Sequence, residues 1–219
     1  MKYKCLVLDH DDTVVNSTAT IHYPCYAQYI AERKPHLVGK FSLEAYLCKS
    51  FHPGVLEFFE NDIGLTREEI REEEVYWRDY VKNHIPTAYE GIKEILERFQ
   101  AEGGILAVAS HSFSHYIERD YKKNSLPMPQ KIYGWDLSLE KRKPAPFALI
   151  DLMERYGLSA EEILMVDDLK PGFDMARAVG VPFAAAGWAY DIEEISSFMR
   201  RHCDFYLSSV GELSSLLFG

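Results

Sequence analysis

The sequence predicts an α/β fold in which helices cover both faces of a mostly parallel sheet, with an all-helical insertion after the first strand. From residue 86 onward, short apolar runs alternate with segments of helical periodicity, whereas residues 17–85 have helical patterns and no strand candidate. Parallel strands joined by helices require such alternation and read as nearly continuous apolar runs. We therefore expect a discontinuous core of residues 1–16 and 86–219, and a helical domain of residues 17–85.

The first strand, Cys5–Leu8, is short, apolar and rich in branched residues, which indicates a strand buried on both faces. It is followed by Asp9, His10, Asp11 and Asp12. If the chain stays extended, period-two alternation sends Asp9 and Asp11 to one side and His10 to the other, where we expect a packed or hydrogen-bonded histidine. Two carboxylates that lie so near each other cannot both stay ionised unless a cation lies between them or one of them holds a proton. The acids at the end of this strand are therefore expected to serve a chemical function and not to stabilise the fold.

The insertion is predicted to be a set of four helices. Apolar and aromatic residues at helical spacing indicate helices near 21–30, 42–48 and 55–59. Thr66 and Glu69 form a capping box that begins a fourth helix. We interpret the run of acids that follows, Glu68 to Glu74, as a solvated face of that helix.

Beyond residue 86, helices and strands are expected in alternation. One helix, at about 92–99, ends at Gly103-Gly104, and the others are expected at 144–156, before Gly180 and from Asp191. The strands are expected at 105–109, 132–135, 163–166, 181–186 and 203–207, the last at an edge of the sheet. Because ligands of such sheets collect beyond the carboxyl ends of the strands, polar residues that follow strands are the candidate functional residues.

Composition restricts the possible partners and the compartment. The chain has 219 residues, a net charge of −10 and 47% apolar residues, so it can bury a substantial core but has no basic footprint for a nucleic acid or an anionic membrane. A small phosphorylated metabolite remains possible, because a metal and one lysine can reverse the local field. No segment is long enough to cross a membrane, and the first apolar run is too short for a signal peptide. We expect a cytoplasmic protein whose scattered cysteines are reduced thiols: Cys5, Cys25, Cys48 and Cys203.

Polar residues follow several of the predicted strands, and their order resembles the motifs of the haloacid dehalogenase-like hydrolase superfamily along the whole chain. The segments that carry the resemblance are Asp9-His10-Asp11-Asp12-Thr13, Ala107-Val108-Ala109-Ser110, Lys143-Pro144-Ala145-Pro146, and Val166-Asp167-Asp168 with Gly172 and Gly180. The closing Cys203–Leu207 followed by Glu212-Leu213 is similar to the phosphoglycolate phosphatase and β-phosphoglucomutase-like branch. The resemblance implies a Rossmann-like, doubly wound core with a helical cap domain.

The resemblance also implies a role for each motif in phosphoryl transfer. Asp9 corresponds to the nucleophile that accepts the phosphoryl group, and Asp11 to the acid/base. Phosphoryl transfer needs an in-line nucleophile and dense positive charge around the phosphoryl oxygens. Ser110, the amide of His111 and Lys143 would supply part of that charge. Magnesium prefers hard oxygen ligands, which Asp9, the backbone carbonyl of Asp11, Asp168 and Asp167 could supply; for Asp167, direct and water-mediated contact both stay open.

Three positions need comment. Asp12 stands where the family usually has glycine, so it either alters the turn or adds an acid near the site. His111 stands where asparagine is frequent, so its amide can serve while its side chain does something else. Lys143 rather than Lys141 is the expected phosphate lysine, because Pro144 follows it.

The helical insertion is expected to select the substrate, because the core would treat any phosphate monoester alike. The candidates are Lys49 and His52, just before Pro53-Gly54, where a loop between helices could approach the site. An ordinary surface loop explains the same residues.

The sequence thus predicts a magnesium-dependent phosphatase that hydrolyses a small phosphomonoester through an aspartyl-phosphate intermediate. The alternative is a sugar phosphomutase of the same family, which would use the same residues and differ in how its closed cap excludes water. Dehalogenase and phosphonatase activities are less expected, because members of the family with those activities lack an acid equivalent to Asp11. A non-catalytic binding or regulatory module is also less expected, because it would not need the nucleophile Asp9.

Overall fold

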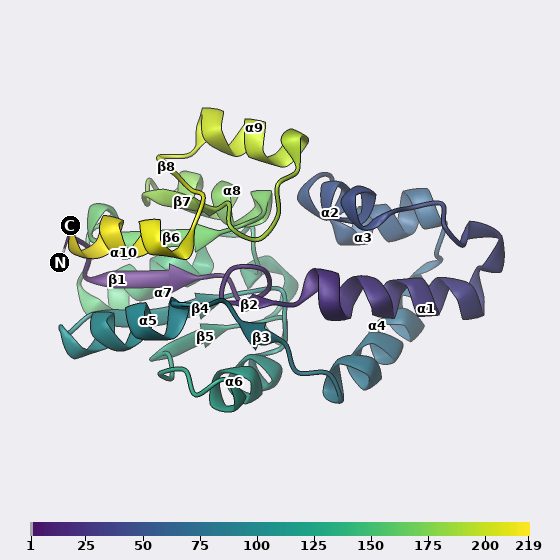
Figure 1. The fold of residues 1–219 in the computed structure, drawn as a ribbon, viewed down its shortest axis with the longest axis horizontal. Coiled ribbons are helices and arrows are strands. Elements are labelled where there is room, and N and C mark those ends of the chain that lie inside the picture. Colours follow the sequence, from purple (N-terminus) through teal and green to yellow (C-terminus); the bar gives the residue numbers. More distant parts are fainter. Residues whose placement is uncertain (1) are drawn as a thin grey trace. The chain divides into compact units, whose positions relative to one another are not determined.

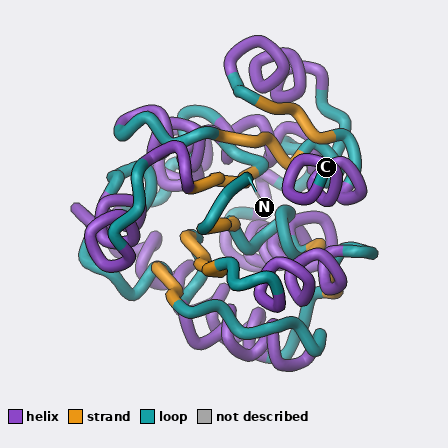
Figure 2. Tube along the Cα trace, turned by 90° about the vertical axis from the view of Figure 1, so that its left-hand side faces the viewer, coloured by secondary structure: helices purple, strands orange, loops and turns teal. Residues whose placement is uncertain are grey.

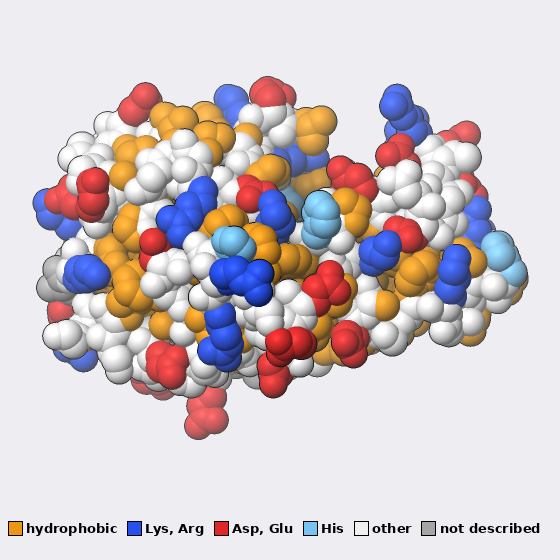
Figure 3. Space-filling model, turned by 90° about the horizontal axis from the view of Figure 1, so that it is seen from above, with side chains coloured by type: hydrophobic (Ala, Val, Ile, Leu, Met, Phe, Trp, Pro, Cys, Tyr) orange, Lys and Arg blue, Asp and Glu red, His pale blue; other side chains and the backbone are white. Residues whose placement is uncertain are grey.

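The computed structural model describes residues 2–219, which form two compact units. One unit contains the residues up to Asn16 together with Thr87–Gly219, and the other is Ser17–Pro86. The second boundary lies one residue later than the sequence suggested. On the face shown in Figure 3, acidic and basic side chains both occur, with apolar side chains between them.

The core unit contains a six-stranded sheet in which every strand pair is parallel, as the sequence predicted. The strand order is β5-β4-β1-β6-β7-β8. β1 (Cys5–Leu8) lies in the middle, and Leu8 is in register with Val108 of β4 and Val166 of β6. The other strands are β4 (Ile105–Ala109), β5 (Lys131–Tyr133), β6 (Ile163–Asp167), β7 (Phe183–Ala186) and β8 (Phe205–Leu207). The chain segments after β1, β4 and β6 therefore leave the sheet side by side.

Helices cover both faces of this sheet (Figures 1 and 2). They are α5 (Ile92–Ala101), α6 (Ser114–Lys123), α7 (Phe147–Tyr156), α8 (Lys170–Ala178), α9 (Glu193–His202) and α10 (Val210–Phe218). Helices α5, α6 and α10 share a buried cluster with Leu6 and Leu8 of β1, and Figure 1 draws α10 above and α5 below that strand. Burial on both faces explains why the central strands are apolar throughout.

Helix α6 was not predicted. Its buried side consists of Tyr116, Ile117, Asp120 and Tyr121, so an acid interrupts the apolar periodicity that would identify a helix. The predicted strand at 132–135 is shorter, because β5 ends at Tyr133.

A second, two-stranded sheet joins the points where the chain leaves and re-enters the core. β2 (Val15–Asn16) pairs antiparallel with β3 (Thr87–Ala88). Tyr89 adds a further backbone hydrogen bond, from its amide to Val14 O at 3.0 Å. The sequence did not reveal these strands, since two residues are too few for a recognisable alternation.

The helical unit contains α1 (Tyr23–Arg33), α2 (Leu43–Phe51), α3 (Val55–Glu57) and α4 (Arg67–Lys82), with π-helical segments at Thr18–His22 and Phe58–Ile63. All four predicted helices are present, and the capping box of Thr66 and Glu69 is formed by both of its hydrogen bonds. The core of the helical unit is aromatic: Tyr26, Tyr29, Tyr46, Phe58 and Phe59 are buried together.

The acidic run on α4 is only partly a solvated face. Glu68 and Glu72 are exposed, as expected. Glu73 is half-buried, and burial raises its pKa to about 7, with a further contribution from Glu74. Glu69 and Glu74 are half-buried as well, so the run is divided between solvent and the helical unit.

In residues 2–219, none of the helices combines the length and the apolar character that spanning a membrane requires. No disulfide joins the cysteines in residues 2–219.

Candidate active site

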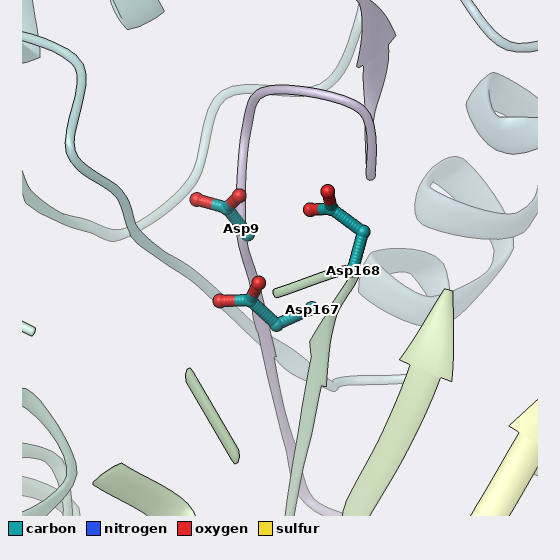
Figure 4. Close-up of side chains that lie close together, drawn as sticks. All are labelled: Asp9, Asp167 and Asp168. Atoms are coloured by element: carbon teal, nitrogen blue, oxygen red, sulfur yellow. The ribbon is translucent and has the colours of Figure 1, made fainter. Parts of the chain in front are cut away.

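Three carboxylates meet at the carboxyl ends of the two central strands. Asp9 follows β1, Asp167 is the last residue of β6, and Asp168 follows it. One oxygen from each lies within 4.8 Å of the others, and all three residues are buried. Figure 4 shows the three carboxylates gathered around one space beyond the strand ends. The register of β1 with β6, extended by the hydrogen bond from Asp9 N to Val166 O (2.9 Å), brings them together.

Lys143 is the cation of this cluster. Its Nζ lies 2.8 Å from Asp9 Oδ1 and 2.6 Å from Asp167 Oδ2, and its side chain is almost fully buried. Burial alone would lower the pKa of Lys143, but the carboxylates of Asp167 and Asp9 outweigh it and raise the pKa above its ordinary value. Lys143 is therefore a permanently charged ammonium group. Lys141, which was not the expected phosphate lysine, has its Nζ over the ring of Phe147 instead.

Asp167 is held by its own turn. Its Oδ1 accepts a hydrogen bond from the amide of Leu169 at 2.8 Å, while Oδ2 faces Lys143. A Cβ atom at Gly172 would come within 2.1 Å of Asp167 Oδ2, so only glycine fits there. Burial raises the pKa of Asp167 to about 7, although Lys143 acts in the opposite direction.

Asp168 is oriented by two hydroxyl groups. Thr13 Oγ1 donates to Oδ1 at 3.2 Å, and Tyr190 Oη donates to Oδ2 at 2.8 Å. Burial, followed by the charges of Asp167 and Asp9, holds the pKa of Asp168 well above its ordinary value. A carboxylate in this position is unfavourable unless positive charge compensates it.

The donor set fits a hard divalent cation. Three buried carboxylates face one ammonium group, so negative charge is in excess. Lys143 Nζ is the one donor beside Asp9 Oδ1 among residues 2–219. Carboxylate oxygens are the ligands that Mg²⁺ prefers, and a bound divalent ion would balance the remaining negative charge.

Asp11 lies outside the three-carboxylate cluster. It is half-buried, and its Oδ2 accepts a hydrogen bond of 2.5 Å from Ser112 Oγ. Ser110 is buried after β4, and its Oγ accepts a hydrogen bond from the amide of Ser112 at 3.2 Å. The ends of β1 and β4 thus contact each other through Ser112, which the sequence did not single out.

The side chain of His111 turns to the loop that carries Lys143. Its Nε2 lies 3.0 Å from Lys143 O, and its ring meets the edge of Trp135 at 5.4 Å between centroids. Because a carbonyl oxygen only accepts, Nε2 is the protonated nitrogen. Burial, then the charge of Lys143, lowers the pKa of His111 to about 4, so the imidazole is neutral.

Asp12 and His10 have structural explanations. Asp12 has φ of 55°, the left-handed conformation that glycine adopts most easily and that aspartate tolerates, so it keeps the turn and adds a buried acid. His10 points away from Asp9, as the alternation predicted, and its Nε2 lies 3.1 Å from Asp120 Oδ2.

The two candidate specificity residues lie near the end of α2 in the helical unit. Lys49 Nζ contacts both carboxylate oxygens of Asp62, at 2.8 and 2.9 Å. His52 is exposed and follows the last residue of α2.

Sequence reasoning missed three site residues: Ser112, Thr13 and Tyr190. Thr13 belongs to the first motif and Ser112 follows Ser110 by two residues, so both had a positional signal. Tyr190 had none, because it comes from the loop after β7 and reaches Asp168 only through the fold.

A family model described as haloacid dehalogenase-like hydrolase matches residues 6–186. The chain is 33% identical over 104 residues to a phosphoglycolate phosphatase from Aliivibrio fischeri, which covers 47% of this chain and 45% of that relative. It is 24% identical over 196 residues to a phosphoglycolate phosphatase from Pseudomonas savastanoi pv. phaseolicola, covering 86% of this chain and 71% of that relative. The chain thus spans about half the length of the first relative and more of the second.

A solved structure with a similar fold is a haloacid dehalogenase-type family hydrolase from Deinococcus radiodurans with bound phosphate and sodium. Its TM-score is 0.72 at 19% identity, over 99% of this chain and 95% of that chain. At this level of identity the likeness concerns the fold.

Proposed function

The chain belongs to the haloacid dehalogenase-like hydrolase family, and from this premise we propose that it is a magnesium-dependent phosphatase acting on a small phosphomonoester through an aspartyl phosphate on Asp9. One observation carries the proposal: the carboxylate of Asp9 lies at the carboxyl end of the central strand, with the charged Lys143 2.8 Å away and two further carboxylates beside it. A carboxylate oxygen held next to positive charge in this way can act as the nucleophile toward phosphorus.

Asp9 is the nucleophile. One of its oxygens attacks phosphorus, a P–O bond to Asp9 forms, and the P–O bond to the alcohol breaks. Lys143, which stays protonated beside Asp9, neutralises charge on the phosphoryl oxygens. Ser110 Oγ and the amide of His111 are the further phosphate donors that we propose, both in the turn after β4.

Asp11 carries the proton. It donates a proton to the departing alcohol oxygen in the first step. In the second step it removes a proton from the water that attacks phosphorus, and the bond to Asp9 breaks to release inorganic phosphate. Its carboxyl group lies outside the three-carboxylate cluster, so it would not be occupied as a metal ligand when it transfers a proton.

Asp9, Asp167 and Asp168 would hold Mg²⁺, together with the backbone carbonyl of Asp11. The bound ion supplies charge stabilisation to the phosphoryl oxygens. Thr13 and Tyr190 orient Asp168 for this purpose, and Gly172 leaves the space that Asp167 occupies. A hydrogen-bonded partner behind each metal ligand is the common arrangement in metalloproteins.

The substrate is proposed to be a small phosphorylated metabolite. Relatives described as phosphoglycolate phosphatases make 2-phosphoglycolate the first compound to test. We assign substrate selection to the helical unit, residues 17–85, with Lys49 and His52 as candidates. Lys49 is already paired with Asp62, so its contribution would be to fix that loop as much as to contact a substrate.

The test is phosphate release from 4-nitrophenyl phosphate by the full chain with Mg²⁺, for wild type and Asp9→Asn. We expect wild type to be active and Asp9→Asn to lose activity by ~10³-fold or more, since the nucleophile acts in every turnover. Glu97→Gln, an exposed carboxylate changed in the same way, is the matched control and should keep full activity. Full activity of Asp9→Asn would refute the mechanism.

A panel of phosphorylated metabolites then identifies the substrate, with isomerisation of sugar phosphates followed in parallel. Phosphate release from one compound supports the phosphatase. Isomerisation without release would replace it by the phosphomutase.

A further inference from the structure

Ser112 connects two parts of the proposed site. It is almost fully buried in the turn after β4, and its Oγ donates a hydrogen bond of 2.5 Å to Oδ2 of Asp11, on the segment that follows β1. Its amide donates to Ser110 Oγ at 3.2 Å. One residue thus contacts both the proposed acid/base and the proposed phosphate-binding hydroxyl.

Ser112 is itself held firmly by the neighbouring strand. Its carbonyl oxygen accepts a hydrogen bond from the amide of Trp135 at 2.9 Å. The backbones approach so closely that a Cβ atom at Gly134 would lie 2.8 Å from Ser112 O. The amide of Ser110 is bonded to Tyr133 O at 2.9 Å. The turn therefore cannot shift without breaking its bonds to β5 and the residues that follow it.

The contacts determine where two protons point. A serine hydroxyl has one hydrogen, and that of Ser112 is directed at Asp11, which restricts rotation of the carboxyl group about its Cβ–Cγ bond. The amide of Ser112 occupies a lone pair of Ser110 Oγ, so the hydroxyl hydrogen of Ser110 points elsewhere and is available to a phosphoryl oxygen. A short hydrogen bond to a carboxylate is among the stronger kinds in proteins.

We propose that Ser112 is a positioning residue that holds the Asp11 carboxyl in the orientation from which it transfers a proton to the leaving group. The inference rests on the proposed function, because it takes Asp11 as the acid. Ser112 touches neither the substrate nor the reacting phosphorus, and it acts through Asp11 and Ser110.

The test compares two substrates that differ in their need for a proton. Phenyl phosphate releases phenol, whose pKa of about 10 makes proton donation important, whereas 4-nitrophenyl phosphate has a much better leaving group. The quantity compared is kcat/KM, which reports the steps up to cleavage of the ester. For Ser112→Ala we expect a loss of roughly 10- to 100-fold with phenyl phosphate and of less than about 3-fold with 4-nitrophenyl phosphate.

Two further variants make the test specific. Ser112→Thr keeps the hydroxyl and should restore kcat/KM for phenyl phosphate. Ser114→Ala removes a hydroxyl two residues away that bonds Asp136 instead of Asp11, and should affect the two substrates equally. Urea unfolding of each variant shows whether it is folded, and an unfolded Ser112→Ala leaves the comparison of Ser112→Thr with Ser112→Cys, which keeps the volume but donates weakly.

The outcomes separate the two proposals. If wild type and Asp9→Asn are equally active or equally inactive, the proposed function fails. If wild type is active through Asp9 but the Ser112 variants lower kcat/KM for both substrates alike, or for neither, the positioning role of Ser112 is wrong and the proposed function stands.

Discussion

Two buried ion clusters lie on opposite sides of the segment that follows β1, and they differ in how completely their charges are matched. Asp9 faces Lys143 and Asp167, and the next residue, His10, faces Asp120 of α6. We call the first the strand-end cluster and the second the helix cluster, which also contains Arg119.

We call the helix cluster closed because its carboxylate is matched by a cation, although His10 Nδ1 has no hydrogen-bond partner among residues 2–219. Asp120 Oδ1 lies 2.8 Å from Nε and 2.7 Å from a terminal nitrogen of Arg119. Asp120 Oδ2 lies 3.1 Å from His10 Nε2. One carboxylate is thus matched by one guanidinium, and each of its oxygens has a partner. The ring of His10 stacks on that of Tyr121, at 5.9 Å between centroids.

The strand-end cluster is open. With Asp168, it has three carboxylates for one ammonium group, and Asp9 Oδ1 has no donor besides Lys143 among residues 2–219. A closed cluster contributes to the fold, whereas an open one lowers stability and persists where function requires it. The two clusters should therefore respond in opposite ways when a carboxylate is removed.

The largest effect on stability is expected for Asp120→Ala. It removes the carboxylate that contacts both Arg119 and His10, and breaking a buried ion pair from one side costs about 3–5 kcal/mol. Urea unfolding measures the loss, and Glu118→Ala, an exposed carboxylate on the same helix, should change stability by less than about 0.5 kcal/mol. In the folded variant, loss of 4-nitrophenyl phosphate hydrolysis as severe as that of Asp9→Asn would mean that the helix cluster is also part of the site.

Asp168→Asn should change stability in the opposite direction and stabilise the protein. The folded state holds the pKa of Asp168 well above its ordinary value, so wild type loses stability as pH rises above about 4, the pKa of an unfolded aspartate. In EDTA at neutral pH, we expect Asp168→Asn to be more stable than wild type by about 1–2 kcal/mol. Asp174→Asn, an exposed carboxylate on α8, is the control.

Adding Mg²⁺ should reverse the order of stability of wild type and Asp168→Asn. Binding to the folded state alone stabilises it by mass action, and Asp168→Asn loses a ligand, so excess Mg²⁺ should stabilise wild type more than the variant. Equal stabilisation of both by Mg²⁺ would show that Asp168 does not take part in binding the ion.

An effect on the pH dependence of stability, similar in size to that of Asp168→Asn, is expected from His111, a neutral histidine beside the open cluster. Because its folded pKa is lowered from 6.5 to about 4, the unfolded chain binds a proton first as the pH falls, and stability is lost between these values. His111→Asn should flatten that loss by about 1–2 kcal/mol, measured by urea unfolding at a series of pH values. The control is His115→Asn, an exposed histidine on α6; an unchanged pH slope in His111→Asn would contradict the expectation.

Much of the core could be read from local patterns. The strands around β1 are continuous apolar runs, and the residues after them carry the family motifs, so the sequence identifies Asp9, Lys143, Asp167 and Asp168, which the structure brings together. Helix α6 escaped, because the acid that closes the helix cluster, Asp120, sits where an apolar residue would have marked a buried helix face.

The sequence by itself determined the local elements and the chemical types at the strand ends, because periodicity and capping act over a few residues. Only the tertiary structure decided which groups meet. Ser112 reaches Asp11 across 101 residues and His10 reaches Asp120 across 110, and both contacts depend on the order and register of the strands. That register decides which acid is matched and which is left open, and so separates the carboxylate that stabilises the fold from those available for chemistry.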